Sequence, residues 1–244
     1  MPVLNWFDDG PLPGDANMRR DEELLRRCRP GDDPVLRLYR WSPPAVSLGW
    51  HQKADEFDAA LIAARGFGLV RRPTGGRAIL HAEELTYAVV APVPSPAFGS
   101  SLHDAYAAIN AALLLFLERV GARPSLAAGE SLAEARGLVC FRSSGRHELS
   151  IGGRKIVGSA QRRTETAFLQ HGSLLTGPAH AELVELLAPA RRGAQTRAGK
   201  RGDRRRGAEK REGKGEGERG WLRLFGDEPV QQVLRLFRTL QYHL

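Results

Sequence analysis

The first half of the chain alternates between short apolar runs and clusters of Gly, Pro and Asp. Runs rich in Val, Leu and aromatic side chains predict strands at 35–41, 45–49, 67–72 and 85–91. Apolar residues spaced three and four apart predict helices at 15–28, 56–65 and 101–120. Asp15 is the expected N-cap of the first helix, and Ser101 with Asp104 matches a capping box at the start of the third.

The stretch 137–175 predicts a loop that carries Cys140, followed by a three-strand meander. A Gly152-Gly153 turn, where both positions favour positive φ, would join the first two strands. Pairing of the strands could bring Cys140 close to Lys155, and a thiol beside an ammonium ionises more readily. A small buried thiol and an exposed strand lysine would carry no such chemistry, and the residues alone leave both interpretations open. The meander strands are expected at 147–151, 154–161 and 167–175.

Further elements are expected as a helix that begins near Pro178, a strand at 221–225 and a helix at 229–241. The whole pattern predicts an α+β fold, one domain with a mixed, largely antiparallel sheet covered by helices. We expect three parts along the chain: a folded core at 1–190, a basic low-complexity insertion at 191–220, and a strand and helix at 221–244 that pack back on the core.

The net charge of +8 is concentrated in one segment. Residues 191–220 contain twelve Lys and Arg against five Asp and Glu, a net charge of +7, which leaves about +1 for the rest. The segment is rich in Gly and has no large apolar residue, so it is expected to be disordered. A nucleic-acid-binding tail is the alternative, but the segment has no interleaved aromatic residues that could stack on bases. The composition therefore favours a solvated insertion over a nucleic-acid partner.

Composition also narrows the cellular setting. Hydrophobic residues make up 42% of the 244 positions, as in soluble globular proteins. The longest apolar run, at 107–117, is too short to cross a bilayer, and the first twenty residues lack a signal-peptide pattern. Cys28 and Cys140 are the two cysteines, so neither a disulfide framework nor a C-x-x-C metal site is predicted. We therefore expect a cytoplasmic protein with no membrane partner and no metal.

Six motifs follow one another along the chain. They are DANMRRDEELL at 15–25, RWSPPAVSLGWHQ at 40–52, RRPTGGRAILHAEELTYAVV at 71–90, CF-x-S at 140–143, GRKIVGSAQRR at 153–163 and LQHGSLL at 169–175. Together they resemble the lipoate–protein ligase/octanoyltransferase superfamily, whose fold is the BPL/LPL catalytic domain. The cysteine motif with GRK-x-x-GSAQ is most similar to the LipM-type octanoyltransferases. Arg19 and Arg20 depart from the small apolar residues expected there, which could alter how the first helix docks.

The resemblance implies transfer of an octanoyl group from octanoyl-acyl carrier protein to a lysine of a lipoyl-domain protein. Acceptors of this kind are the glycine cleavage H protein and the 2-oxo acid dehydrogenase E2. Cys140 would carry the acyl group as a thioester, and Lys155 would lower the thiol pKa and position the acyl carbonyl. Cys28 is expected on a helix face, without a catalytic role. The resemblance implies these substrate-binding residues: Arg71, Arg72, Thr74, Gly75, Gly76, His81, Gly158, Ser159, Ala160, His171 and Gly172.

Some of these residues have a second interpretation from their type alone. Paired glycines such as Gly75 and Gly76 let the backbone approach a ligand, and they also suit a hairpin turn. His81 by itself would be a hydrogen-bonded structural histidine.

Arginines near the expected site would steer acidic carrier or lipoyl domains towards it. Local arginines are needed because the chain outside 191–220, with a net charge of about +1, produces little long-range electrostatic attraction of its own. They are Arg71, Arg72, Arg77, Arg154, Arg162 and Arg163.

Other activities remain open within the same resemblance. ATP-dependent lipoate ligation uses this fold with the strand lysine on the adenylate, and would need ATP and Mg²⁺, whereas the transferase needs no cofactor. Such ligases commonly rely on an accessory domain, and the short stretch after 220 leaves little room for one, which favours the transferase. Acyl amidotransfer between lipoyl domains uses similar residues. The non-enzymatic alternative is an acyl-binding relic with a nucleic-acid-binding basic tail.

Overall fold

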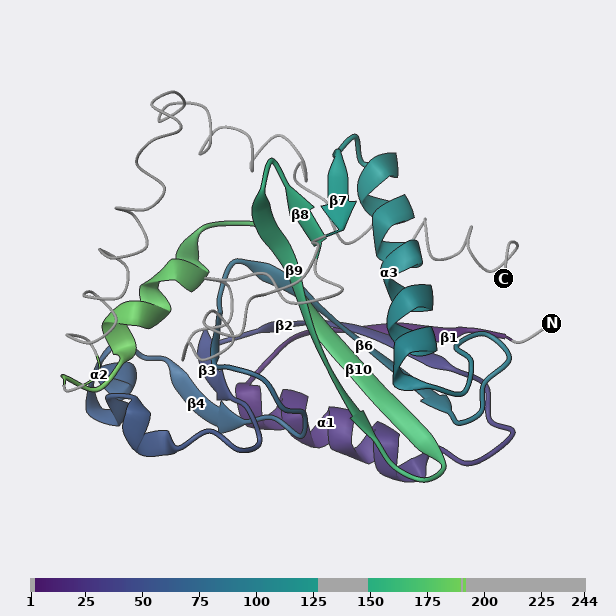
Figure 1. Cartoon of the computed structure of the whole chain (residues 1–244). Helices are drawn as coiled ribbons and strands as arrows, with labels where there is room; N and C mark the ends of the chain where they lie inside the picture. The colour runs from purple at the N-terminus through teal and green to yellow at the C-terminus, as the bar shows by residue number, and fades with distance from the viewer. Residues whose placement is uncertain (1–2, 127–148, 190, 192–244) are drawn as a thin grey trace.

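A computed structural model describes residues 3–126, 149–189 and 191. Seven strands form the main sheet in the order β1-β2-β6-β10-β9-β8-β7 (Figure 1). Strands β1 and β2 run parallel, and the other neighbouring pairs run antiparallel. The bounds are β1 Asn5–Leu12, β2 Val35–Trp41, β6 Glu84–Pro92, β7 Pro124–Leu126, β8 Leu149–Ile151, β9 Arg154–Arg163 and β10 Ala167–Leu175.

Helices cover both faces of the main sheet, and β6 and β10 are accordingly buried along their whole length (Figure 1). One face packs against α3 (Leu102–Arg119) and the other against α1 (Gly14–Arg27). Neighbouring residues of one strand enter the two cores, as Leu38 and Tyr39 of β2 do, because side chains alternate across a strand. The predicted inward-facing residues of α3 are confirmed: Ile109, Leu113, Phe116 and Leu117 are buried, and Val120 packs beside them.

A second sheet of three strands, in the order β4-β3-β5, lies beside α1. Short helices complete its core, which is formed by Val46, Leu80, Leu183 and their neighbours. The connection from β5 to the main sheet is very short, because β6 begins three residues after β5 ends. The bounds are β3 Ala45–Leu48, β4 Gly68–Arg71, β5 Ile79–His81, η1 Ala54–Glu56, α2 Ala59–Ala64 and η4 Ala179–Leu186.

The predicted α+β architecture is confirmed, and several local predictions hold with it. Strands 35–41 and 167–175 have the predicted bounds. Both halves of the Ser101–Asp104 capping box are present at the start of α3. Gly152 and Gly153 adopt φ values of 56° and 75°, as the predicted hairpin turn requires.

Other local predictions are wrong for identifiable reasons. The first helix begins at Gly14 after Pro13, so Asp15 lies in its first turn and pairs with Arg19 instead of capping it. The predicted helix at 56–65 is interrupted because Phe57 adopts an extended conformation and pairs with Leu187. The helix after Pro178 is a 3₁₀ helix, η4. Three strands, β1, β5 and β7, were not predicted at all.

Arg19 and Arg20 do not disturb the docking of α1, because both side chains face solvent on the outer side of the helix. Arg20 lies over the ring of Phe7 and near Asp9 of β1. Within the described residues, no helix is long and apolar enough to cross a membrane. The predicted Cys140 loop, most of the basic segment 191–220 and the elements predicted at 221–244 lie outside the described residues.

Candidate functional site

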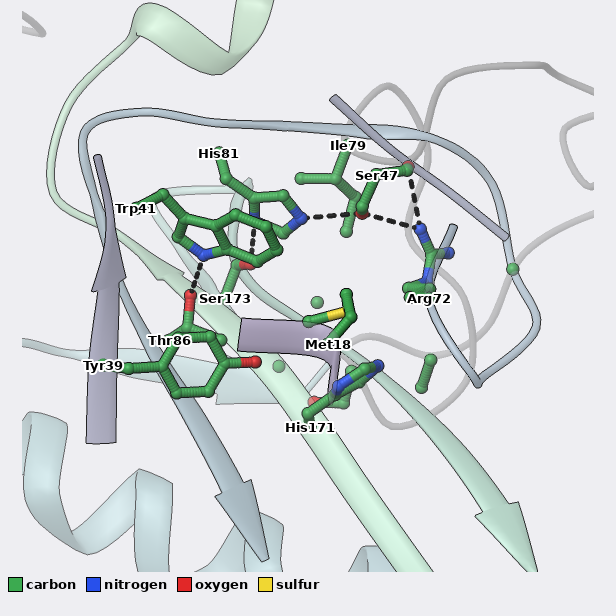
Figure 2. Close-up of a pocket in the computed structure, with 15 residues that line it drawn as sticks. Met18, Tyr39, Trp41, Ser47, Arg72, Ile79, His81, Thr86, His171 and Ser173 are labelled. Atoms are coloured by element: carbon green, nitrogen blue, oxygen red, sulfur yellow. Dashed lines mark hydrogen bonds between the residues drawn. The ribbon is translucent and has the colours of Figure 1, made fainter. Parts of the chain in front are cut away.

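A pocket lies on the α1 face of the main sheet, where this sheet meets the second sheet and the loop at 72–76 (Figure 2). It holds about 430 Å³ of empty space, part of it open to solvent. Eight of the predicted substrate-binding residues line it, namely Arg72, Gly76, His81, Gly158, Ser159, Ala160, His171 and Gly172. The rest of the wall was not predicted and consists of Met18, Tyr39, Trp41, Ser47, Ile79, Thr86 and Ser173.

Asp21 of α1 is the centre of one buried network beside the pocket. Its Oδ1 accepts a hydrogen bond from Arg37 Nη1 (2.7 Å), and its Oδ2 accepts from the Tyr39 hydroxyl (2.9 Å) and from His171 Nδ1 (2.8 Å). Because an ionised carboxylate only accepts, the His171 proton is on Nδ1, and Nε2 accepts from the Thr74 hydroxyl at 2.7 Å. Burial lowers the pKa of His171, although the hydrogen bond to Asp21 acts in the opposite direction. His171 is therefore a neutral link between β10, α1 and the Thr74 loop.

Glu84 is the centre of a second network, where β5 leads into β6. Its Oε1 accepts from the Thr86 hydroxyl (2.6 Å), from His81 Nδ1 (2.7 Å) and from the Ser173 hydroxyl (2.8 Å). The other ring nitrogen of His81, Nε2, accepts a hydrogen bond from the Ser47 hydroxyl at 2.7 Å. His81 is thus a structural histidine, as its residue type suggested, and it also forms part of the pocket wall.

Arg72 holds the glycine loop in place and is not a surface arginine. Its side chain is buried and donates to the carbonyl oxygens of Gly75 (2.8 Å), Arg77 (2.7 Å) and Ser47 (3.1 Å). The expectation that Arg72 steers a partner is therefore wrong. A buried guanidinium with five donors can satisfy several carbonyl groups at once, which a turn of this kind requires.

The glycine loop also packs tightly against the end of β3. A Cβ built on Gly49 would lie 1.9 Å from the carbonyl oxygen of Gly76, so no larger residue fits at 49 without moving the loop. By contrast, a Cβ on Gly75 would meet nothing within 4 Å. Arg71 is exposed, and its Nη1 donates to the carbonyl oxygens of Gly49 and Trp50, both at 2.8 Å. Of the predicted binding residues, Arg71, Thr74 and Gly75 therefore support the pocket from behind.

The polar groups of the described wall are largely satisfied within the protein. The Tyr39 hydroxyl donates a hydrogen bond to Asp21, and the Thr86 and Ser173 hydroxyls donate hydrogen bonds to Glu84. The indole N–H of Trp41 donates to Thr86 Oγ1 at 2.8 Å. Trp41 in turn presents a ring face that stacks on His81, with centroids 3.8 Å apart and planes 7° from parallel. With Met18 and Ile79, this wall offers a ligand mainly carbon surface, although many of its residues are polar (Figure 2).

Ser159, Gly172 and Tyr87 lie side by side on three neighbouring strands. Gly172 of β10 pairs with Tyr87 of β6 on one side and with Ser159 of β9 on the other. The Tyr87 and Ser159 hydroxyls meet at 2.6 Å across this glycine. A Cβ on Gly172 would lie 2.7 Å from the Tyr87 ring and 2.8 Å from Ser159 Oγ. The glycine therefore makes the hydrogen bond between its two neighbours possible.

Lys155 is the second residue of β9 and lies two positions after the Gly152-Gly153 turn. It pairs with Ser150 of β8 and is buried. Cys140 lies outside the described residues, so the contact between Cys140 and Lys155 stays a prediction. The other cysteine, Cys28, ends α1 and is buried there, as expected for a helix-face residue, and burial raises its thiol pKa.

A site for a metal ion is not visible in the part of the chain that the structure describes, because no three His, Cys, Asp or Glu side chains are grouped there to hold one. The unpredicted wall residues carry a weak sequence signal. Tyr39 and Trp41 occupy alternate positions of a strand, as residues on one face must. Asp21 lies three positions after Met18, on the apolar face of α1.

Comparison with known proteins agrees with this geometry. The family model of the lipoyl protein ligase A/B catalytic domain matches residues 13–207. Octanoyltransferase LipM of Moorella thermoacetica is 41% identical over 181 residues, which are 72% of this chain and 66% of that protein. The chain thus spans slightly less than two thirds of the length of this relative.

Solved structures share the fold at lower identity. A bipartite lipoate protein ligase from Thermoplasma acidophilum, studied with its E2 lipoyl domain, superposes with a TM-score of 0.67 at 22% identity, covering 99% of this chain and 84% of that one. A lipoate-protein ligase A bound with ATP gives a TM-score of 0.62 at 23% identity, covering 99% and 94%. The match of the family model over most of the chain, together with this fold and the pocket between its two sheets, places the protein in the lipoyl protein ligase A/B catalytic domain family.

Proposed function

We propose that this protein transfers an octanoyl group from octanoyl-acyl carrier protein to a lysine of a lipoyl-domain protein, through a thioester on Cys140, in the biosynthesis of lipoate. The observation that carries the proposal is the pocket, whose polar side chains are already hydrogen-bonded to one another and whose free surface is mainly carbon. A saturated acyl chain needs such a surface, since it has no polar group to bind. Similarity to a curated octanoyltransferase supports the choice of acyl group.

The chemistry asks for two steps at one sulfur atom. In the first, the Cys140 thiolate attacks the donor thioester carbonyl, and the carrier thiolate leaves, so that one thioester replaces another. In the second, the neutral amine of the acceptor lysine attacks the Cys140 thioester, the amide forms, and the cysteine thiolate is released while the amine proton goes to a base or to solvent. The first step is nearly balanced in free energy and the second is downhill, so no ATP is required.

Lys155 would serve both steps through its charge. An unperturbed thiol is only a few per cent ionised at pH 7, and a nearby ammonium favours the thiolate. The buried position of Lys155, two residues after a tight turn, restricts where its ammonium can lie. Electrostatic attraction is stronger there than in water, because the local dielectric constant is lower. The same ammonium could orient the acyl carbonyl towards the sulfur.

Acceptors in this proposal are the glycine cleavage H protein or the E2 component of 2-oxo acid dehydrogenases. The similar fold of a ligase studied with its E2 lipoyl domain supports an acceptor of this class. The reaction needs a reduced Cys140, and we therefore assign it to the cytoplasm.

Intact-protein mass spectrometry after mixing with octanoyl-carrier protein tests the proposal. The wild-type protein should gain one octanoyl group without ATP, and the group should move to an added lipoyl domain. Cys140→Ser should remain unmodified, whereas Cys28→Ser, the matched control at the other cysteine, should be acylated normally. Modification of the lipoyl domain only with free lipoate, ATP and Mg²⁺ would show that the protein is a ligase and would reject the proposal.

A further inference from the structure

A tryptophan of the loop after β3 is held half-exposed beside the pocket. Trp50 is 48% exposed and does not belong to any hydrophobic core cluster of the described residues. Its backbone is nevertheless tied to its neighbours, because Trp50 N–H donates to the Thr74 carbonyl (2.9 Å) and its own carbonyl accepts from Arg71 Nη1. An exposed aromatic side chain on a fixed backbone contributes little to the core, and it loses little conformational freedom on binding a partner.

Two arginines surround this tryptophan. The guanidinium of Arg162, on β9, lies 5.3 Å from the centre of the Trp50 ring, and its Nη1 reaches the Pro73 carbonyl at 3.4 Å. Arg71 contacts only carbonyl oxygens in its hydrogen bonds, and neither arginine takes part in an ion pair of the described residues. Their positive charges therefore remain available to an acidic partner. We call Trp50, Arg71 and Arg162 the Trp50 patch.

The Trp50 patch adjoins the pocket through three direct connections. Thr74 bonds to Trp50 through its carbonyl oxygen and to His171 of the wall through its hydroxyl. Gly49, next to Trp50, packs against the pocket residue Gly76. Arg162 follows the pocket residue Ala160 by two positions on β9. A domain seated on this patch would therefore hold its nearest side chains at the edge of the acyl site.

We propose that the Trp50 patch is the docking surface for the acidic domain that presents the acceptor lysine. This inference rests on the proposed function and adds to it the place where the acceptor binds. A tryptophan flanked by arginines is the composition typical of the few residues that dominate the energy of protein interfaces. The complementary partner surface is one with carboxylates around the reactive lysine.

The distance over which each substrate protein can present its reacting group indicates whether the acceptor or the donor binds the Trp50 patch. A lysine side chain is a four-carbon stem, so its domain must sit directly at the mouth of the acyl site. A carrier protein delivers its acyl group on a much longer prosthetic arm, so it can dock farther away. Surface next to the pocket is thus expected to serve the acceptor.

The test separates docking from chemistry by using two reactions of the full-length protein. Formation of the acyl-enzyme from octanoyl-CoA, a small thioester, reports the acyl site alone. Transfer from the acylated protein to an isolated unmodified lipoyl domain, measured over a range of domain concentrations, reports docking. Trp50→Ala and Arg162→Glu should each raise the KM for the lipoyl domain by roughly tenfold, the loss expected at a dominant interface residue. Both should leave acylation by octanoyl-CoA and the thermal unfolding temperature close to wild type.

Matched controls lie on the opposite face of the sheet or beyond it. Leu102, at the start of α3, is also 48% exposed, and Arg123 is an exposed arginine after that helix. Leu102→Ala and Arg123→Glu should leave the KM for the lipoyl domain unchanged, and Trp50→Tyr should restore most of the affinity lost in Trp50→Ala. The wild-type KM should also rise with salt, more steeply than that of Arg162→Glu, because salt screens exposed charges.

Three contradicting results would be distinguishable. A wild-type protein that is not acylated by octanoyl-CoA or octanoyl-carrier protein would reject the proposed function itself. Normal acylation, with a KM for the lipoyl domain that is the same in wild type, Trp50→Ala and Arg162→Glu, would reject the docking surface alone. If these variants instead slowed acylation by octanoyl-carrier protein and spared the transfer to the lipoyl domain, the patch would bind the donor and the inference would be wrong.

Discussion

Replacement of Asp21 by Asn should destabilise the fold by about 3 kcal/mol, more than most single substitutions do. The carboxylate is fully buried and accepts hydrogen bonds from Arg37, Tyr39 and His171, which come from two strands of the main sheet. Asparagine has nearly the same shape but only one acceptor oxygen. Its amide group would face a second donor wherever it points, and a buried N–H would lose its partner.

The expected loss of stability follows from the charge of Arg37, which remains buried after Asp21 is replaced. Removing one partner of a buried ion pair typically costs about 3–5 kcal/mol, because the other charge is left without compensation. Arg37 would keep one carboxylate, since its Nε also contacts Asp9 at 2.7 Å and the Asp9 side chain is only 18% exposed. The loss should therefore fall at the lower end of that range. A total stability of about 5–15 kcal/mol would leave the variant folded in water.

Urea unfolding followed by tryptophan fluorescence measures this loss as a shift of the midpoint at constant slope. Asp15→Asn is the matched control, because Asp15 belongs to the same helix and pairs with an arginine, yet its side chain is 59% exposed. It should unfold like the wild type, as exposed pairs contribute little. If Asp21→Asn lost less than about 1 kcal/mol, the carboxylate would not be the electrostatic centre of the network.

Three further outcomes follow from single contacts. Gly49→Ala should destabilise the fold by about 3 kcal/mol and abolish acylation, because the added Cβ would overlap the Gly76 carbonyl. Gly75→Ala, the control, should be tolerated. Equal effects of the two substitutions in urea unfolding would contradict the close packing at Gly49. Gly172→Ala should cost about 1–3 kcal/mol because the added Cβ would overlap the Tyr87 ring, the Ser159 hydroxyl and the Gly158 carbonyl, and a neutral effect would show that the strands adjust freely. Burial lowers the pKa of His171, so the unfolded chain binds more protons below pH about 6.5 and stability should decrease as the pH falls through that value. His171→Asn should make the dependence of unfolding free energy on pH less steep, and an unchanged slope would show that His171 does not titrate on unfolding.

The elements that the sequence predicted well are those whose pattern reflects one dominant force. Strand β10 begins and ends with apolar residues and is bounded by recognisable turns, so its bounds could be read directly. Strand β1 could not, because its sequence NWFDDGPL combines two acidic residues with Gly and Pro. It forms at the sheet edge, where Asp9 meets Arg37 of the neighbouring strand. A partner distant in sequence therefore decides the conformation, and no local pattern contains it.

The residues of the pocket likewise divide into those whose position the sequence predicted and those whose position it did not. The glycine loop and His171 belong to motifs that the family resemblance made visible, and most of these residues line the pocket. Thr74, Gly75 and Arg71 belong to the same motif but act behind the wall, as hydrogen-bond partners or exposed supports. A motif identifies which segments meet at a site. Which side chains of the motif face the ligand depends on backbone direction, which only the folded chain determines.

The buried carboxylates Asp21 and Glu84 are among the residues that the sequence analysis missed, although Asp21 occupies a position with a readable signal. Asp21 stands in a run of charged residues, RRDEE, and the exposed Arg19 and Arg20 show that such a run usually faces solvent. Its position three residues after Met18 and four before Leu25 nevertheless places it on the apolar face of the helix. Arg37 likewise shares a strand face with Tyr39 and Trp41. A charge on the apolar face of a helix and an opposite charge on the apolar face of a strand can each be buried only if they meet, so the two patterns together predict the ion pair that neither predicts alone.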